Sequence, residues 1–429
     1  MRRTKDHPQR LRLNNEVHAR PPGEINGSKQ ITYLAWMTEG DQVDFEWQRL
    51  TKLLEHFGVD IGEPSNHVSV NLGPCHMRWE RHTEFTRFTL IDNEPLGEPF
   101  AKSVLRHIPQ TWLDECQNRV IVATEVAQLI EHEPSRSFGE IADRFFDGNV
   151  LVGSQIAEGA AIALTDFAVR SDGYSRLLLI NDAMPPQQAG RMLQRLLEID
   201  TYRIMTLLAL PVAQSLNPFL NGIEEELVEL SEALSDSDEL DEQHLLDVLT
   251  KMEAVSENRQ LATGYRFSAA RAYNDLVDRR IDELREVRIP GKQTYREFTQ
   301  RRLSPAVKTC DAIANRQHSL ALRMSRITKL LSTRVDIARQ QQNQHLLESM
   351  DRRGRVALRL QQMVEGLSIA AISYYVVGLV QYLAKGLEAA GFGVNPTVIV
   401  AASVPFIVVI VAVATYTVRK RIERDTNPT

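Results

Sequence analysis

The sequence predicts an α+β protein, in which an N-terminal mixed α/β domain precedes a helical region with a long stalk helix and two C-terminal transmembrane helices. Three observations predict this order. Strand-like and helical runs alternate over residues 1–210, helical spacing of apolar residues dominates from residue 211 onward, and two long uncharged segments lie near the C-terminus. With 43% hydrophobic and 25% charged residues among 429, the chain is a folded protein rather than a disordered one.

The first domain, residues 1–210, contains five runs typical of strands. They are Ile31–Met37, His67–Leu72, Met77–Ile91, Val120–Thr124 and Leu151–Ser154. The clearest local signal is a hairpin whose two apolar runs flank Ser171, Asp172 and Gly173. Glycine adopts positive φ without steric cost, so this tripeptide is a suitable turn.

Helices follow this domain. A helix is expected after Pro185 and Pro186 and is expected to end by Pro211, because proline suits the first helical turn and apolar residues recur at helical spacing. Three more helices are predicted in and around a helical acidic region, residues 211–303. Their ranges are 217–235, 242–256 and 263–288.

Charge is unevenly distributed along these helices. Between Asn221 and Gln260 there are 13 acidic residues and two basic ones, and from Arg323 to Arg359 there are nine basic residues and three acidic ones. Such blocks are typical of solvated helix faces, and otherwise indicate contacts between segments or with lipid headgroups.

The long stalk helix, residues 304–366, is predicted to begin at Pro305 and to run into the first span. Small and apolar residues in it are spaced alternately three and four apart: Val307, Cys310, Ala314, Gln317, Ala321, Met324, Thr328, Leu331, Val335 and Ala338. This heptad pattern indicates a coiled coil, whose partner is either other helices of the same chain or the same helix in other subunits. The pattern becomes polar over residues 340–345.

Two uncharged segments predict a transmembrane hairpin, residues 367–418. Leu367–Ala384 has 18 residues and Val398–Val418 has 21, enough at about 1.5 Å per residue to cross a bilayer core of roughly 30 Å. Arginines precede the first span, a basic tail at 419–429 follows the second, and the short loop between them offers only Lys385. Because positive residues stay inside, both termini are expected in the cytoplasm.

One face of the first span is polar. Tyr374, Gly378, Gln381 and Lys385 are spaced by four, three and four residues, so they share a side of the helix. In a symmetric oligomer these residues, with Asn343 in the stalk, are candidates for the lining of a pore. The alternative is that tyrosine and glutamine satisfy each other across a helix pair while Lys385 reaches the interface. Lysine at a pore mouth would repel cations.

A second candidate site lies near the N-terminus. Glu16, His18 and Arg20 alternate within LNNEVHARPP. A carboxylate, an imidazole and a guanidinium together are ligand-binding candidates that could bind an anion or do acid-base work. An extended arm docked on the sheet is the competing interpretation. Asp200 and Arg203 are expected to form an ion pair one helical turn apart, with Tyr202 in the core.

The other polar residues that could form a site are expected to have structural roles rather than catalytic or metal-binding ones. His76, Arg78, Glu80 and His82 alternate along a strand, and a solvated polar strand face is expected there rather than a metal site. The three cysteines are far apart, and no secretory signal is present. Phosphate-binding glycine loops, a nucleophile elbow and HExxH are all absent from the sequence, so we expect no catalytic residues and no enzyme.

Several strings resemble a bacterial family of membrane proteins known only as a domain of unknown function. They are LNNEVHARPP, DGYSR, EIDTYR, RRLSPAVKTC, TRVDIARQQQNQHLLESM and VEGLSIAAISYY. The resemblance extends over nearly the whole chain and implies a bacterial inner-membrane protein, without implying an activity.

The predicted architecture also resembles the CorA-type magnesium channels, which are homopentamers with a long stalk helix and two C-terminal spans. Their Gly-Met-Asn motif is absent, since the region after the first span reads Gly391, Phe392, Gly393, Val394 and Asn395. The resemblance implies a homo-oligomer, with a pentamer favoured, in a lipid bilayer. A divalent cation is the one cofactor it brings, and nucleic acid is not an expected partner.

These observations favour a CorA-like ion channel or transporter, with the acidic helices as a cytoplasmic cation sensor. The alternative is a membrane-tethered scaffold or sensor with no pore. An enzyme would instead need a pocket that gathers Glu16, His18, His76 and His82.

Overall fold

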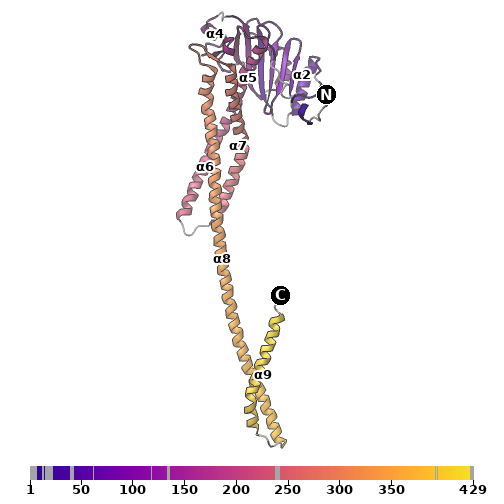
Figure 1. Ribbon diagram of the computed structural model, residues 1–429, viewed down its shortest axis with the longest axis vertical. Helices are drawn as coiled ribbons and strands as arrows, with labels where there is room; N and C mark the ends of the chain where they lie inside the picture. The colour runs from indigo at the N-terminus through magenta and orange to yellow at the C-terminus, as the bar shows by residue number, and fades with distance from the viewer. Residues whose placement is uncertain are drawn as a thin grey trace, which may run out of the picture. The chain divides into compact units, whose positions relative to one another are not determined.

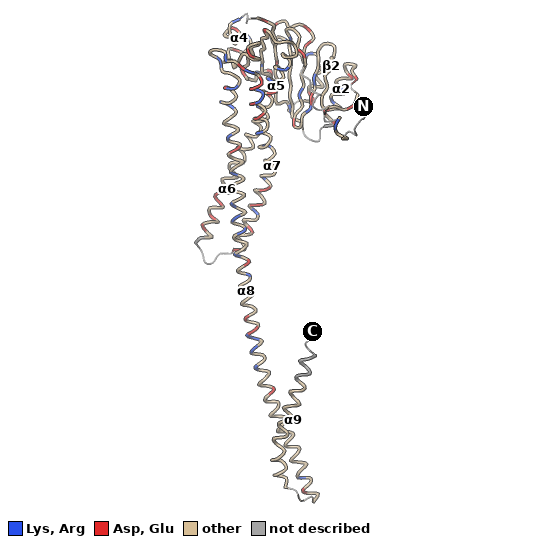
Figure 2. Tube along the Cα trace, in the orientation of Figure 1, with Lys and Arg blue, Asp and Glu red and all other residues tan. Residues whose placement is uncertain are grey.

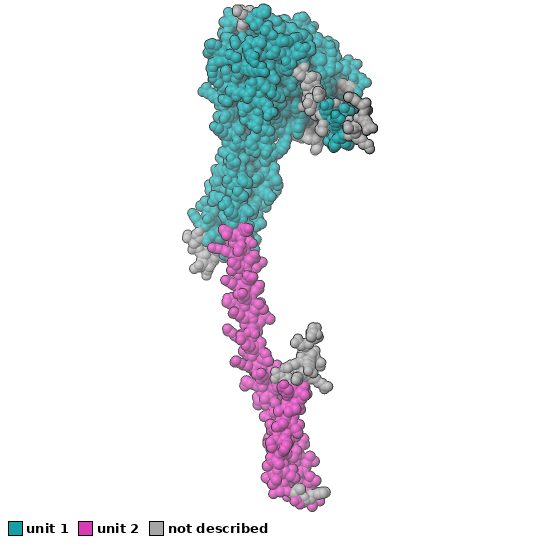
Figure 3. Space-filling model, viewed as in Figure 1, with its two compact units in different colours: residues 1–328 teal, residues 329–429 magenta. Residues whose placement is uncertain are grey.

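The computed structural model describes residues 7–11, 14, 23–38, 43–60, 62–116, 118–132, 136–236, 242–391, 393 and 395–425. The chain divides into two compact units, Met1–Thr328 and Lys329–Thr429 (Figure 3). Unit 1 contains a sheet with its covering helices and a helical bundle, and unit 2 contains only helix. The predicted α+β fold class is confirmed (Figure 1).

Unit 1 is built on a nine-stranded mixed sheet in the order β2-β3-β4-β1-β5-β8-β7-β6-β9. The strands are β1 Lys29–Met37, β2 His67–Asn71, β3 Cys75–Arg81, β4 Phe85–Asp92, β5 Val120–Ile130, β6 Val152–Ile156, β7 Ala161–Thr165, β8 Ser175–Asn181 and β9 Val287–Arg288. Neighbours are antiparallel except β5 and β8, which run parallel. The parallel pair is at the centre, where both faces are covered.

The helical elements are α2 Val43–His56, η2 Val104–His107, α3 Gln110–Asp114, α4 Phe138–Phe145, η3 Ala157–Gly159, α5 Pro186–Leu207, α6 Ala209–Asp236, α7 Glu242–Leu284, α8 Tyr295–Ala389 and α9 Pro396–Asp425. Alternate residues of β1 separate the two sides of the sheet. Ile31 and Tyr33 belong to the core under α5, whereas Leu34 and Trp36 belong to the core under α2, η2 and α3.

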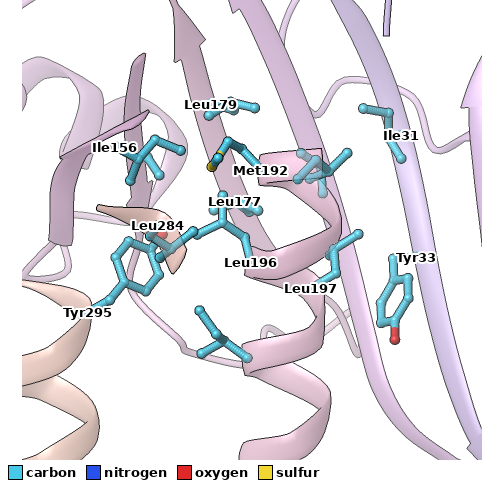
Figure 4. Packing of buried hydrophobic residues seen from close by; sticks show 14 of the residues in the cluster. Ile31, Tyr33, Ile156, Leu177, Leu179, Met192, Leu196, Leu197, Leu284 and Tyr295 are labelled. Carbon is cyan, nitrogen blue, oxygen red and sulfur yellow. The ribbon is translucent and has the colours of Figure 1, made fainter. Parts of the chain in front are cut away.

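The larger core lies between the sheet and α5. Leu193, Leu196 and Leu197 of α5 belong to one buried cluster with Leu177 and Leu179 of β8. Figure 4 shows Leu196 beside Leu177. Tyr295 at the start of α8 and Leu284 at the end of α7 close the same core. Each of these buried side chains contributes about 1.5–3 kcal/mol of hydrophobic stabilisation, so the beginning of α8 is fixed to the sheet.

The strand predictions are confirmed with two main differences. The run Met77–Ile91 is two strands, β3 and β4, joined by a turn at residues 82–84. β5 extends six residues beyond Thr124, to Ile130. The predicted hairpin pairs β7 with β8, and Gly173 has φ +87°, as its turn requires.

The helix predicted after Pro185 and Pro186 is confirmed as α5. Other helices are longer than predicted, partly because prolines were taken as boundaries. α6 begins at Ala209 and contains Pro218, and α8 begins ten residues before Pro305. Proline inside a helix costs roughly 3 kcal/mol. Burial of Tyr295 and Leu303 at 1% and 2% exposure outweighs that cost in α8. The predicted helices 242–256 and 263–288 are one helix, α7.

The upper part of α8 belongs to a bundle with α6 and α7. Nε of Arg316 donates to Glu224 of α6 at 2.9 Å, and Arg271 of α7 pairs with Asp311 at 3.3 Å. Cys310, Gln317 and Met324 of the predicted heptad pattern are buried here. Within unit 1, the partner of this pattern is therefore the same chain.

A chain of buried charges connects the sheet to the helices. Arg87 of β4 is 4% exposed and forms ion pairs with Glu80 of β3 and, at 2.8 Å, with Glu198 of α5. Glu198 also pairs with Arg280 of α7, which pairs with Glu283 at 2.9 Å. Glu80 was expected on a solvated strand face with Arg78, and that expectation is wrong because α5 covers the face and buries both side chains.

The network changes the acidity of its carboxyl groups. Burial alone would raise the pKa of Glu80, but the charge and hydrogen bond of Arg87, with help from Arg78, outweigh burial and lower the pKa to about 2. The pKa of Glu198 is lowered by Arg87 and Arg280 against the same effect of burial. A carboxyl with a lowered folded-state pKa stabilises the fold above its ordinary pKa and loses that contribution as the pH falls toward the folded value.

We therefore expect Glu80→Gln to lower the thermal unfolding midpoint of the detergent-solubilised chain at neutral pH. Breaking a buried ion pair typically costs about 3–5 kcal/mol. The fall of the midpoint between about pH 5 and about pH 3 should also become shallower, because one titrating carboxylate is gone. Thermal unfolding measured across this pH range tests both effects.

Glu98→Gln is the matched control, because Glu98 pairs with Arg144 at 2.7 Å but both side chains are about half exposed. Its midpoint should change little. A Glu80→Gln protein as stable as Glu98→Gln at neutral pH would contradict the role of the buried network.

Candidate functional site

Unit 2 consists of α8 from Lys329 onward and α9, and its charges are placed unevenly. No charged residue occurs in α8 from Leu367 to Ala384 or in α9 from Pro396 to Val418 (Figure 2). Both helices are long and apolar enough to cross a membrane, and most of their side chains are not buried inside the protein. The two predicted spans thus coincide with observed helices.

In unit 2, α8 and α9 each have one side with buried residues, where the two helices pack. Ser373 and Ala384 of α8 are buried, as are Ile407 and Val411 of α9. Ser373 and Ala384 are 11 residues apart, close to three full turns, so they share one face. Among the described residues, most other side chains of α8 in this region are exposed.

The four span residues predicted to line a pore lie on one of these uncovered faces. Tyr374 is 78% exposed, Gln381 and Lys385 are exposed, and Gly378 is half-buried. A Cβ built on Gly378 would meet no atom within 4 Å. The first pore candidate follows the buried Ser373 directly, so this face is rotated by about 100° from the face that packs on α9.

The face of α8 that carries these four residues continues toward the N-terminus of the helix as a second heptad pattern, which we call the open seam. Outside the span most of its members are apolar. Its members are spaced alternately three and four apart: Asn343, Leu346, Met350, Arg353, Ala357, Leu360, Val364, Leu367, Ala371, Tyr374, Gly378, Gln381 and Lys385. All are exposed except the half-buried Gly378. A gentle left-handed supercoil keeps such a pattern on one side of a helix.

All five pore candidates, including Asn343, are members of the open seam, although Asn343 lies far along the helix from the other four. Sequence reasoning missed the residues that connect them, above all Arg353, Leu360 and Val364. The signal was available, because the apolar residues after the polar stretch 340–345 resume the three-four spacing. They resume it one residue later than the pattern that ends at Ala338, and the two patterns are therefore different faces of one helix.

The other candidate site, formed by Glu16, His18 and Arg20, lies outside the described residues. The described chain resumes at Gly23, where the backbone lies against α5. A Cβ on Gly190 of α5 would fall 1.6 Å from the carbonyl oxygen of Gly23, so only glycine allows this approach. The backbone N–H of Ile25 donates to the carbonyl of Pro186 at 3.1 Å.

Beneath Gly23 is a cavity of about 30 Å³ that is lined by Arg78, Glu80 and Arg87. This volume holds one or two waters and no larger ligand. The expected pair of Asp200 and Arg203 is present at 2.5 Å, and Tyr202 is buried as predicted. Across the part of the chain that the structure describes, no group of three or more His, Cys, Asp or Glu side chains is arranged to hold a metal ion.

Comparison with known proteins places the chain in a family. Residues 5–422 match the family described as "Protein of unknown function (DUF3422)". No curated protein matches the sequence. Because the match covers nearly all of the 429 residues, as the resemblance of the sequence strings indicated, the chain belongs to the DUF3422 family of proteins of unknown function.

Proposed function

We propose that the protein is a bacterial inner-membrane protein that assembles from several identical chains, and that their α8 helices together form an ion path. The observation that carries this proposal is the open seam, which stays exposed among the described residues from Asn343 to Lys385, apart from the half-buried Gly378, and becomes polar inside the first span. The proposal extends the architectural resemblance to CorA-type channels and leaves the transported ion open.

The upper half of the open seam supports assembly. From Arg339 to Val364 every residue of α8 is exposed, and this stretch includes Leu346, Met350 and Leu360 at 61–64% exposure. An unpacked helix is marginally stable in water and gains most of its stability from an apolar face that packs. A second copy supplies a matching face at once, because closed symmetric assemblies place the same surface of each chain around one axis.

The width of the apolar surface favours more than two chains. A two-stranded coiled coil buries only the two seam positions of each heptad. Here Leu347, Val356 and Met363, which flank the seam, are apolar and 62–67% exposed as well. A stripe this wide is suited to contact neighbours on both sides, as in a ring of helices.

The lower half of the seam supports a path. A glutamine and a tyrosine that face lipid lose the hydrogen bonds they would make with water. Around a central axis, the same side chains can hydrogen-bond to one another, to water or to an ion. Two spans of one chain cannot enclose an axis. Between Arg353 and Tyr374 the seam offers Ala357, Leu360, Val364, Leu367 and Ala371, an apolar segment that would act as a gate by excluding water.

Orientation follows from the flanking charge. Arg352, Arg353, Arg355 and Arg359 precede the first span, and Arg419, Lys420, Arg421 and Arg424 follow the second. We propose that both ends of the hairpin, and with them unit 1 and both termini, lie in the cytoplasm.

Assembly is tested by substitution at Gly378. The protomer has open space at this position, so Gly378→Leu should fold and insert normally, yet its side chain would separate neighbouring helices of the ring. We expect a smaller particle, or a mixture of masses, when the protein is extracted in detergent or nanodiscs and weighed by native mass measurement.

Gly386→Leu is the control, because Gly386 also has open space but lies one residue off the seam. It should leave the mass of the wild-type particle unchanged. A wild-type particle of one or two chains would remove the path, and the protein would then be a membrane-tethered scaffold or sensor.

The path is tested by substitution in the apolar segment. Leu367→Ser should increase ion leakage from proteoliposomes, because a ring of hydroxyl groups holds water where leucine excludes it. Fluxes of K⁺, Mg²⁺ and Cl⁻ are measured separately. Leu379→Ser, on an exposed face off the seam, should not increase leakage. Equal leakage in both variants would show a general disturbance of the bilayer and would argue against an axial path.

A further inference from the structure

Arg353 occupies an unusual place in the open seam. Its neighbours along the seam are Met350 on one side and Ala357 and Leu360 on the other, all apolar. It is the only charged residue of the seam between Asn343 and Lys385. An apolar seam therefore contains one full positive charge per chain, at the cytoplasmic entrance of the proposed path.

Within the described part of α8, the charge of Arg353 has no acidic residue beside it to balance it. Residues three and four positions away are Ser349, Met350, Val356 and Ala357, none of them acidic. Arg355, two residues on, shows the contrast, because it pairs with Asp351 at 2.8 Å. Among the described residues no ion pair or hydrogen bond of the Arg353 side chain is found.

Neighbouring copies cannot balance it either. The acidic residues of this segment are Glu348, Asp351 and Glu365, and heptad spacing places all three on the side of α8 away from the seam. In a symmetric ring every copy of Arg353 would turn toward the same axis. Like charges at that spacing repel strongly where apolar layers above and below keep water and counterions out.

We propose that the Arg353 side chains of the assembled chains bind a small inorganic anion on the axis, at the cytoplasmic mouth of the path. The inference rests on the proposed function, since each copy contributes one guanidinium to the site. A guanidinium presents several N–H donors in one plane and is the preferred side chain for anions of the phosphate or halide type. Gly354 beside it has open space in the protomer and allows neighbouring backbones to approach.

The anion has a structural consequence for the path. With the anion bound, the ring of arginines holds the α8 helices together directly above the apolar segment that begins at Ala357. Without it, repulsion among the guanidinium groups pushes the helices apart at the same level. The assembly is therefore more stable, and the path more tightly closed, when a small anion is present.

The test follows subunit dissociation of the purified, detergent-solubilised full chain after dilution. Three sodium salts are compared at equal ionic strength: chloride, phosphate and gluconate. Gluconate screens charge but is too bulky for an enclosed site. We expect dissociation to be about tenfold slower in chloride or phosphate than in gluconate, a factor typical of one lost charge-assisted contact.

Two variants identify the site. Arg353→Gln should dissociate at one rate in all three salts, because the charge that needs the anion is gone. Arg359→Gln is the matched control, since Arg359 also has no acidic residue three or four positions away but lies off the seam; it should keep the wild-type salt preference.

Equal dissociation of the wild type in the three salts would overturn the anion site while the assembly itself stood. So would a preference for chloride that survives Arg353→Gln. If Arg353→Gln does not assemble, the wild-type comparison still decides. A wild type that is monomeric in every salt overturns the proposed assembly and, with it, this site.

Discussion

The constraint on which the rest of the structure depends is that one helix, α8, carries two heptad patterns that differ by a single residue. The first pattern packs on α6 and α7 and includes Cys310, Gln317 and Met324. Its spacing leads on to Ser373 and Ala384, which are buried within the first span. The second pattern begins at Asn343, and in the described structure its members are exposed except the half-buried Gly378. A residue offset of one turns a helix by about 100°, so the contacts that bury the first pattern leave the second on another face, where it is exposed.

The sequence was sufficient for the first pattern and insufficient for the second. Regular spacing up to Ala338 predicted a seam, and burial of Leu331 and Val335 agrees with it. The polar residues 340–345 looked like the end of that seam. Spacing places the apolar residues beyond it on another face, but spacing alone does not show that this face stays uncovered, because that depends on which positions the protein's own helices cover. Exposure of Leu346 and Leu360 in the folded chain supplies that knowledge.

In the sheet, prediction failed for a different reason: a contact between residues far apart in the sequence overrode the local pattern. Alternation of Arg78 and Glu80 with apolar residues is the ordinary signature of a half-exposed strand, and it predicted solvent on the polar side. The outcome was decided by Glu198, which lies 111 residues beyond Arg87 in the sequence and pairs with it only once α5 covers the sheet. Local patterns do not contain such pairings. Local patterns also underestimate the length of helices such as α8. There the burial of Tyr295 outweighs the energetic cost of the proline ten residues later.

The proposed function depends on symmetry, because the few polar residues of one α8 helix would be repeated around a common axis. A single chain contributes one Gln381, one Lys385 and one Arg353, each tolerable at the surface of a lone helix. Around an axis the same residues become rings, and their effects multiply with the number of chains while water becomes scarcer. In the proposed assembly, the lysine ring would have Glu388 one turn farther out to offset it, whereas the arginine ring would be enclosed by apolar layers. The cytoplasmic mouth is therefore the part of the proposed path where electrostatics most needs a bound partner.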